Sequence, residues 1–388
     1  MTSLPPFIMT SEKGTFARRT IEERKPLIID RILADFDYTP LIRKDLRKLQ
    51  DELKNGQIVP LHEDTSDRSI WDKAVKPWLG KTWLEIPWFL AETFFYRRVL
   101  EIIQYFQPGP WANIDPYRHL KERESTESLP EFIAFFSSRG KEKNLADFKN
   151  ACYRALWGNR GDLSNLDIYE SAMGEQTDKI ILDQTVEAYQ LLTQKPAKIA
   201  YFFDNVGKEL FFDLHLIDYL LEAGLASTIT CYLKNQPFFV SDAMPNDFLM
   251  SMDLLISSPV KEIQNFGKRL KFAQLSQKVT IETPPFLTTS SMYRDMPEVS
   301  FNQLKDHDLV VMKGDVNYRR LFGDRHWPAT TPINAAAKYF PTNFLSLRTL
   351  KADLILGLTE KRLDEILKSA EPDWLTNGRR GMITFFQK

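Results

Sequence analysis

The amino-terminal part of the chain repeats apolar positions at helical spacing. Residues 21–33 and 41–53 place apolar side chains three and four positions apart, with charged side chains between them, and this pattern predicts amphipathic helices. Tryptophan becomes frequent between residues 71 and 111, and residues 83–98 carry aromatic rings on every side of the expected helix. We interpret these rings mainly as core packing, because large aromatic side chains fill cores more often than they line a ligand cleft.

Short apolar runs alternate with helical patterns from residue 198 onward. Residues 208–221 have helical spacing and end before Ala223 and Gly224, a suitable helix stop. Strands that alternate with helices usually form a mostly parallel sheet. The apolar runs, rich in β-branched, leucine and aromatic residues, predict strands at residues 199–203, 227–233, 309–312, 344–347 and 382–386.

The two patterns together predict an α/β fold with two parts. We expect a Rossmann-like, mostly parallel sheet flanked by helices, with an N-terminal α-helical subdomain packed on it. The helical subdomain covers residues 1–175, the α/β core covers residues 176–388, and a short polar linker lies at residues 169–176. Both parts are expected to form one functional unit, with the metal and phosphate site in the core.

The balance of charged residues limits the classes of molecule that the protein is expected to bind. The chain has 51 Lys and Arg against 52 Asp and Glu, without the basic excess of proteins that coat nucleic acid, and no uncharged stretch approaches the roughly 20 apolar residues of a membrane span. We therefore expect no nucleic-acid or membrane partner, and the pattern indicates no particular oligomeric state. The amino terminus has no apolar signal segment, so a cytoplasmic protein is expected, with entry into the nucleus left open. Cys152 and Cys231 are expected to be buried thiols.

Polar residues follow four of the predicted strands at the point where each strand ends. In open α/β sheets, ligands bind beyond the carboxyl ends of the strands, so these residues are the candidates for chemistry. The first strand leads into DNVGKEL at 204–210 and the second into a loop with SDAMPND at 241–247. The third leads into KGDVNYRRL at 313–321, and the fourth runs into RTLK at 348–351.

Asp204, Asn205 and Asp242 form a candidate metal site. They offer two carboxylates and one amide oxygen, which suit a divalent cation such as Mg²⁺ or Mn²⁺ and leave positions for water and phosphate. Asp204 and Asn205 equally fit the N-cap of the helix that follows, where their side chains accept hydrogen bonds from backbone amides. Glu209, a turn into that helix, either reaches back to a polar ligand or complements the helix dipole.

Cationic residues after the third and fourth strands are candidates for binding an anion. Arg348 and Lys351 offer a bidentate fork and a compact charge to phosphate oxygens, and two cations at this spacing are also common on solvated helix faces. Lys313, Asp315 and Asn317 are suited to hold a sugar or a phosphate, and an ordinary strand-to-helix turn explains them equally well. Nucleotide-binding glycine loops, zinc helices and nucleophile elbows are absent from the sequence.

The four motifs together resemble the metal-dependent damage-control phosphatases, once called domain of unknown function 89. The resemblance is to the branch marked by an R-T-x-K motif near the carboxyl terminus, which includes acidic residue methyltransferase-like and sugar phosphate phosphatase proteins. The opening PPFIMTSEKGTFARRTIEERKP and the aromatic WFLAETFFYRRVLE segment also look like that branch, so the resemblance covers nearly the whole chain.

The resemblance implies a divalent cation on Asp204, Asn205 and Asp242, with Mn²⁺, Ni²⁺ or Co²⁺ supporting activity. It implies a phosphorylated small molecule as substrate, especially fructose 1-phosphate or fructose 6-phosphate. A basic residue of the family's G-K-Y-like stretch falls at Arg379, where this sequence has Arg in place of Lys and Arg380 in place of the aromatic residue. Further substrate contacts are implied for Glu209, Arg348, Thr349, Leu350, Lys351 and Ala352.

We therefore expect a metal-dependent phosphatase that removes phosphate from sugar phosphates in metabolite damage control. A cation on the Asp204 site polarises the phosphoryl oxygen and orients a water, while Arg348 and Lys351 neutralise charge on the other phosphate oxygens. One alternative is S-adenosylmethionine-dependent O-methylation of protein glutamate or aspartate side chains, although the usual glycine-rich cofactor loop is missing after Phe203. The other alternative is a non-catalytic module that binds a phosphorylated metabolite.

Overall fold

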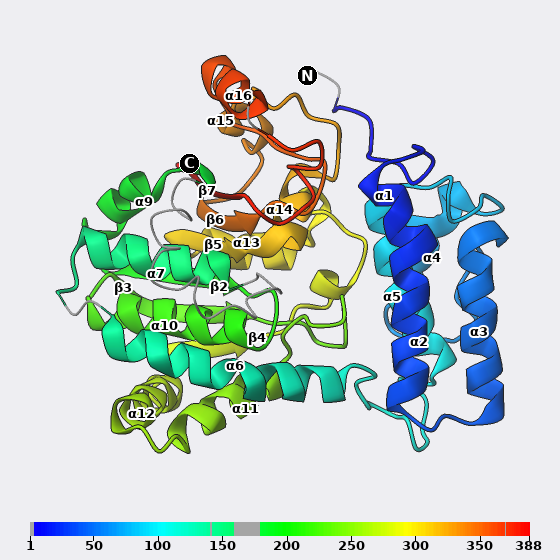
Figure 1. Cartoon of the computed structure of the whole chain (residues 1–388), viewed down its shortest axis with the longest axis horizontal. Coiled ribbons are helices and arrows are strands. Elements are labelled where there is room, and N and C mark those ends of the chain that lie inside the picture. The colour runs from blue at the N-terminus through cyan, green and yellow to red at the C-terminus, as the bar shows by residue number, and fades with distance from the viewer. Residues whose placement is uncertain (1–3, 140–141, 159–178, 369) are drawn as a thin grey trace.

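The computed structural model describes residues 4–139, 142–158, 179–368 and 370–388 and contains one seven-stranded sheet (Figure 1). The strand order is β1-β7-β6-β5-β2-β3-β4. β6, β5, β2, β3 and β4 run parallel, β7 is antiparallel to β6, and β1 runs parallel to β7. The predicted α/β fold with a mostly parallel sheet is confirmed. The strands are β1 (Ile180–Asp183), β2 (Ala197–Phe202), β3 (Ala226–Tyr232), β4 (Val279–Glu282), β5 (Leu309–Lys313), β6 (Asn343–Thr349) and β7 (Gly381–Phe386).

The central strands are buried on both faces. In β2, Ile199 and Tyr201 belong to one hydrophobic core, whereas Phe202 belongs to the other. Strands covered on both faces read as continuous apolar runs, which is why β2, β3, β5, β6 and β7 could be predicted. The pattern does not predict β1 or β4, because each has only four residues and ends in an exposed acid, Asp183 or Glu282.

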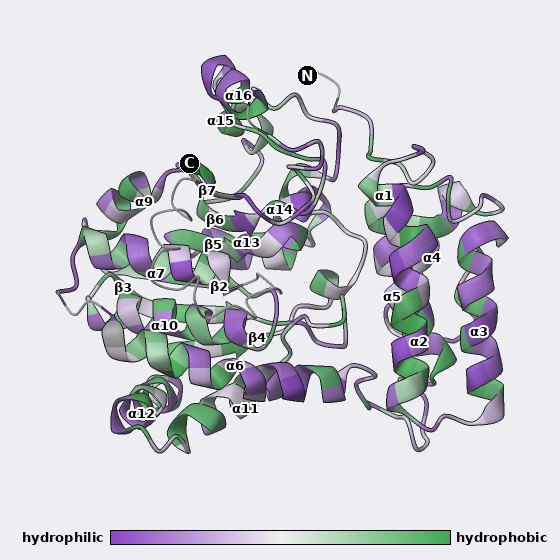
Figure 2. Ribbon diagram, in the orientation of Figure 1, coloured by the Kyte–Doolittle hydropathy of each residue, from purple (hydrophilic) through white to green (hydrophobic). Residues whose placement is uncertain are grey.

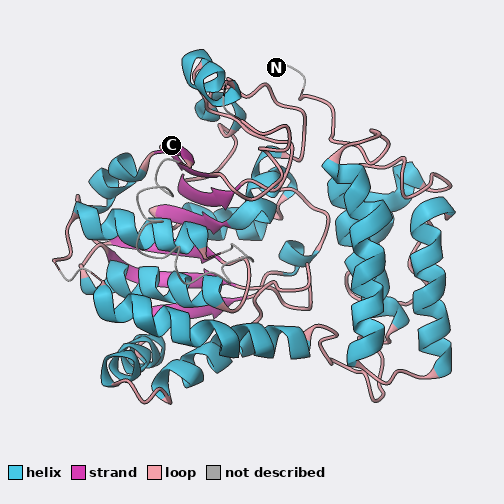
Figure 3. Cartoon of the chain, viewed as in Figure 1, coloured by secondary structure: helices cyan, strands magenta, loops and turns pink. Residues whose placement is uncertain are grey.

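Helices cover both faces of the sheet (Figure 3). The core on one face includes residues of α6 (Arg118–Ser138), α7 (Leu145–Trp157), α9 (Thr185–Leu192), α10 (Lys208–Glu222), α11 (Pro245–Ile256) and α12 (Lys261–Leu275). The core on the other face includes residues of α13 (Glu298–Lys305), α14 (Gly314–Phe322), α15 (Ile333–Ala336), α16 (Glu360–Leu367) and the 3₁₀ turns η4 (Pro285–Thr288) and η5 (Tyr293–Asp295).

The amino-terminal helices form a third core beside the sheet (Figure 1). The predicted helix at residues 21–33 begins as a π-helical turn and continues as α2, and the one at 41–53 is α3. In α3 the buried residues recur at helical spacing, and apart from Pro40 and Leu41 the other positions are hydrophilic, as Figure 2 shows. The helices are α1 (Phe16–Arg19), η1 (Thr20–Arg24), α2 (Lys25–Asp35), α3 (Pro40–Asn55), α4 (Arg68–Val75), η2 (Lys76–Trp78) and α5 (Trp88–Ile102).

The aromatic segment forms α5, in which every residue from Trp88 to Leu100 is buried. Trp71 and Trp83 are also fully buried in the amino-terminal core, so the interpretation as mainly core packing is confirmed, although buried Trp88 and Tyr96 additionally line the cleft described below. Both cysteines are buried and unpaired, as expected. Within the described ranges, no helix combines the length and the apolarity needed to cross a membrane. The predicted linker at residues 169–176, with the boundary at residue 175, lies outside the described residues.

Candidate active site

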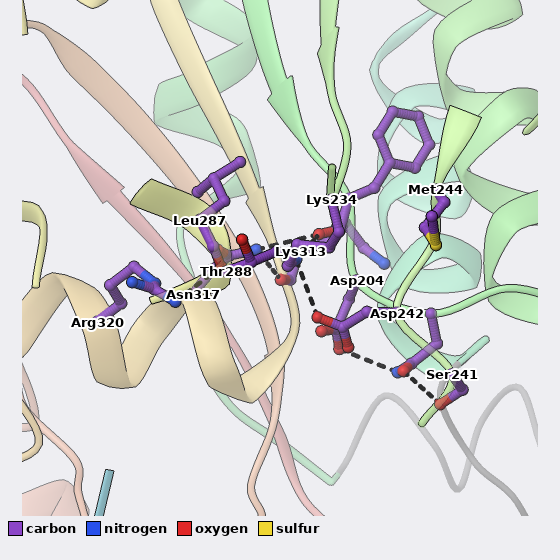
Figure 4. Close-up of polar contacts among 12 residues, drawn as sticks. Asp204, Lys234, Ser241, Asp242, Met244, Leu287, Thr288, Lys313, Asn317 and Arg320 are labelled. Carbon is purple, nitrogen blue, oxygen red and sulfur yellow. Dashed lines mark hydrogen bonds and ion pairs between the residues drawn. The ribbon is translucent and has the colours of Figure 1, made fainter. Parts of the chain in front are cut away.

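Two loops meet at the carboxyl ends of β2 and β3. Asp204 and Asn205 follow β2, and Asp242 lies in the loop that follows β3. The backbone pairs Asn205 with Asp242 in an isolated β-bridge, and Val206 N donates to Ser241 O over 2.8 Å. The bridge brings Asp204 and Asp242 to the same end of the sheet, where Figure 4 shows them close together with Ser241.

Asp204 is buried against the turn from β5 into α14. An ideal β-carbon on Gly314 would lie 1.9 Å from Asp204 Oδ2, so only glycine leaves room for the carboxylate. Gly314 also has a φ of +81°, in the left-handed region that glycine adopts readily. Burial, together with the negative charges of Glu209 and Asp242, raises the pKa of Asp204 well above its usual value. A nearby cation would relieve this repulsion.

Asp242 has one paired and one unpaired carboxylate oxygen. Its Oδ2 forms an ion pair with Lys234 Nζ at 3.0 Å, whereas Oδ1 has no such partner, and neither oxygen accepts a hydrogen bond of good geometry from the described residues. Asp242 is only 1% exposed, and burial raises its pKa even though Lys234 favours the ionised form. Leaving a buried carboxylate oxygen without a partner is costly, so Oδ1 is available to a ligand.

The Asn205 amide is oriented by neighbours on both sides. Its Nδ2 donates to Asp204 Oδ2 over 3.1 Å and to Glu209 Oε2 over 3.0 Å. Its Oδ1 accepts a hydrogen bond from Ser241 Oγ over 2.7 Å. These three contacts hold the amide at the centre of the acidic group.

The side chains of Asp204, Asn205 and Asp242 fit a divalent cation. Two carboxylates and an amide carbonyl are the oxygen donors that such cations prefer. A cation would satisfy Asp242 Oδ1 and favour the ionised form of Asp204, whose pKa is raised by burial and by the charges of Glu209 and Asp242. In the described part of the chain, no three His, Cys, Asp or Glu side chains are grouped as a metal site, so the Asn205 amide is needed as the third donor.

Lys313 lies beneath the site and does not line the cleft. Its Nζ is fully buried, 2.8 Å from Glu209 Oε1 and 2.9 Å from Asp213 Oδ1. Burial raises the pKa of Asp213 to about 7, despite the nearby Lys313 charge. Burial alone would lower the pKa of Lys313, but the charges of Asp213 and Glu209 outweigh burial and raise it. Lys313 therefore holds Glu209, which in turn orients the Asn205 amide.

Arg348 shapes the loop that follows β6. The Arg348 side chain is fully buried, and its Nε donates to Asp315 Oδ1 over 2.7 Å. The guanidinium also donates to Leu354 O over 2.5 Å and to Ala352 O over 3.2 Å. Asp315 Oδ1 additionally accepts from Lys351 N over 3.3 Å. These bonds fix the loop whose Lys351 side chain lines the cleft, while Thr349, Leu350 and Ala352 are buried.

Asn317 and Arg379 are further predicted substrate-binding residues that do not line the cleft. Asn317 is 1% exposed, where its Nδ2 donates to Lys313 O and its Oδ1 accepts from the Tyr293 hydroxyl, each over 2.8 Å. Arg379 is exposed, and its Nη1 lies 3.5 Å from Glu371 Oε1. Substrate contacts by Asn317 and Arg379 stay predictions.

A cleft of about 600 Å³ is lined by residues of the α/β core and of the amino-terminal helices. Figure 3 shows the carboxyl ends of the central strands pointing toward those helices. Burial and the charge of Glu209 raise the pKa of the cleft residue Glu124 to about 7. The core lines the cleft with Asp204, Asn205, Asp242, Asp315 and Lys351, among others. The helical segments line it with residues that include Thr20, Arg24, Lys25, Leu27, Arg31, Glu92 and Glu124. Sequence reasoning did not select these helical residues, because most of them follow the ordinary pattern of an amphipathic helix.

Glu92 joins the amino-terminal helices to the core beside the cleft. Its Oε1 lies 2.9 Å from Lys25 Nζ, and its Oε2 lies 2.6 Å from Arg319 Nη1 of α14. Arg319 Nε lies in turn 2.7 Å from Asp324 Oδ1. Burial opposes ionisation of Glu92, but the charges of Lys25 and Arg319 outweigh it and lower the pKa of Glu92. In the sequence, the position of the acid Glu92 within the aromatic segment of α5 is the feature that indicates a buried ion pair.

Comparisons with known proteins agree with the motifs. The sequence model of the damage-control phosphatase ARMT1-like domain matches residues 20–367. The relative named damage-control phosphatase ARMT1 from Danio rerio is 28% identical over 438 residues, which cover 98% of this chain and 97% of the relative. The relative of the same name from Homo sapiens is 28% identical over 441 residues and covers 99% of each chain.

The fold also has a counterpart among solved structures. A DUF89 family protein from Pyrococcus horikoshii gives a TM-score of 0.52 at 16% identity, covering 93% of this chain and 96% of that chain. At this identity the likeness concerns the fold alone. The match across most of the chain confirms the family resemblance that the motifs carry. The chain belongs to the damage-control phosphatase ARMT1-like family.

Proposed function

We propose that the protein is a metal-dependent phosphatase that hydrolyses phosphomonoesters of sugar phosphates, such as fructose 1-phosphate or fructose 6-phosphate, in metabolite damage control. Membership in a damage-control phosphatase family supports the phosphatase activity. The proposed cofactor is Mn²⁺, Ni²⁺, Co²⁺ or Mg²⁺, because all of these cations accept oxygen ligands.

One observation carries this proposal. Asp204, Asn205 and Asp242 meet in a cleft that Lys351 also lines. Metal-assisted hydrolysis of a phosphate ester needs oxygen ligands for a cation and positive groups for the phosphate, and this cleft contains both. Its volume of about 600 Å³ suits a small metabolite.

The proposed metal ligands are Asp204, Asn205 and Asp242. When bound, the cation supplies Lewis-acid polarisation of the phosphoryl group and a nucleophilic water. Glu209, held by Lys313, keeps the Asn205 amide oriented through the hydrogen bond to Nδ2. These partners pre-organise the oxygen donors, as the neighbours of metal ligands commonly do.

The proposed phosphate contact is Lys351. Its ammonium group stabilises negative charge on the non-bridging phosphate oxygens. Arg348 and Asp315 act on the substrate through the loop, because their hydrogen bonds fix the backbone on both sides of Lys351. Arg348 therefore contributes to substrate binding as a positioning residue for Lys351.

A metal and substrate screen tests the proposed activity. The full chain is stripped of metal with a chelator, then assayed for phosphate release from fructose 1-phosphate, fructose 6-phosphate and nucleoside monophosphates with each of the four cations. We expect release from the sugar phosphates only after a cation is restored. Absence of release with every cation, together with saturable binding of S-adenosylmethionine to metal-free protein, would contradict the proposal and favour methyl transfer.

A further inference from the structure

Two arginines of the amino-terminal helices face the same cleft as the acidic site. Arg24 ends the π-helical turn η1, Arg31 lies in α2, and both line the cleft while being exposed. They lie seven positions apart in the sequence, about 10 Å along a helix, which places them on one helical face two turns apart. Leu27 lies between them on that face and is 66% exposed, so an apolar side chain separates the two charges.

Neither arginine is neutralised by a carboxylate. Elsewhere in the amino-terminal part, arginines such as Arg18 and Arg97 form ion pairs with acids. The Arg24 guanidinium lies 5.2 Å from the centre of the Phe16 ring, and neither the Arg24 nor the Arg31 side chain has a hydrogen bond or ion pair with any residue that the structure describes. Their donors are therefore directed only to solvent and to whatever occupies the cleft.

One acid of the cleft, Glu92, is already engaged by two cations. Glu92 binds Lys25 and Arg319, so it does not offset the charge of Arg24 or Arg31. One side of the cleft thus carries the oxygen donors of Asp204 and its neighbours. The other side carries Arg24 on η1 and Arg31 on α2, whose side chains form no ion pair with a described carboxylate. Two guanidinium groups in a concave site attract and orient an anion.

We propose that Arg24 and Arg31 form a second anion-binding subsite, which selects phosphorylated substrates that carry a further anionic group. This inference rests on the proposed phosphatase function: one phosphate occupies the site near Asp204 and Lys351, and the second anion lies at the arginines. The second group is a phosphate or a carboxylate on the same short carbon skeleton, because the exposed Leu27 contacts the carbon atoms between the two ends.

Matched substrates test the subsite. The rate constant kcat/KM is measured at low salt for fructose 6-phosphate, fructose 1,6-bisphosphate and 6-phosphogluconate, using the metal-loaded full chain and its Arg24→Gln and Arg31→Gln variants. Arg68→Gln is the control, because Arg68 is also a partly exposed helical arginine but does not line the cleft. For the double anions we expect each cleft variant to lose about tenfold, the effect of one charge-assisted hydrogen bond. For fructose 6-phosphate we expect little change.

The outcomes separate the subsite from the phosphatase function. A larger loss for the bisphosphate than for phosphogluconate identifies the second group as phosphate, and the reverse identifies it as a carboxylate. Equal losses for single and double anions, or no loss in either variant, overturn the subsite. If no substrate is hydrolysed, the phosphatase proposal fails, and calorimetric titration of the bisphosphate into the same proteins still decides the subsite. Tighter binding to wild type than to Arg31→Gln supports it, and equal or absent binding overturns it.

Discussion

The carboxylate of Asp204 occupies the space in which any residue other than glycine at position 314 would place its β-carbon. The 1.9 Å between that ideal β-carbon and Asp204 Oδ2 is far below a contact distance. The turn from β5 into α14 therefore passes the end of β2 at a separation that glycine alone permits. The close approach joins two neighbouring strands of the sheet at the point where the proposed cation site lies.

Replacing Gly314 with alanine should displace the Asp204 carboxylate. We expect Gly314→Ala to lower metal-dependent phosphate release strongly, because the new methyl group and Asp204 Oδ2 cannot share the same space. Gly80→Ala is the matched control, since Gly80 has a similar φ of +77° but nothing within 4 Å of its ideal β-carbon. Both variants should lose about 1 kcal/mol of unfolding free energy from the left-handed backbone. Full activity of Gly314→Ala would show that the close approach is unimportant.

Glu92 should stabilise the packing of the amino-terminal helices on the core. Glu92→Gln leaves Lys25 and Arg319 buried without their shared carboxylate, so we expect a loss of about 3–5 kcal/mol in chemical unfolding. The comparison is Glu85→Gln, because Glu85 is exposed and its side chain accepts hydrogen bonds only from Thr82. Equal unfolding free energies for the two variants would rule out a stabilising role for the Glu92 pairs.

Asp213 should make stability depend on pH. Burial raises the pKa of Asp213 to about 7, so the folded protein binds a proton that the unfolded chain releases near pH 4. The contribution of this group is therefore fully present below about pH 4 and is lost as the pH rises through about 7. We expect Asp213→Asn to make this fall smaller in a series of urea titrations between those pH values, with the remainder due to other buried acids of raised pKa such as Glu124. The exposed Asp253→Asn should retain it, and identical pH profiles for both variants would contradict the assignment.

The sequence predicts most of the sheet because buried strands have a simple signature. The continuous apolar run at 199–203 needed no tertiary information, whereas β4 alternates with polar residues over only four positions. The polar residues after the strands could also be selected from the sequence, because the carboxyl ends of parallel strands lie at the same edge of a sheet. Asp204, Asn205 and Asp242 accordingly meet at one bridge.

The sequence does not predict the direction in which each side chain points. Lys313 and Arg348, like Lys351, were predicted to bind the substrate because they lie in motifs at the ends of strands. In the structure, Lys313 donates to Glu209 and Arg348 donates to backbone carbonyls. The contribution of η1, α2 and α5 to the cleft depends on how the amino-terminal helices pack against the α/β core. No local pattern encodes that packing, so Arg24 and Glu92 could not be assigned to the site beforehand.

The most direct test of the central claim is metal-dependent phosphate release by Asp242→Asn. The substitution keeps the size of the side chain and an oxygen near Lys234, but it removes one negative charge from the proposed cation site. Wild type and variant are compared on fructose 1-phosphate across a Mn²⁺ titration, with circular dichroism to establish that both are folded. We predict that the folded variant releases no phosphate above background at any Mn²⁺ concentration. A folded Asp242→Asn protein with wild-type release would contradict the claim that Asp242 helps to hold the cation.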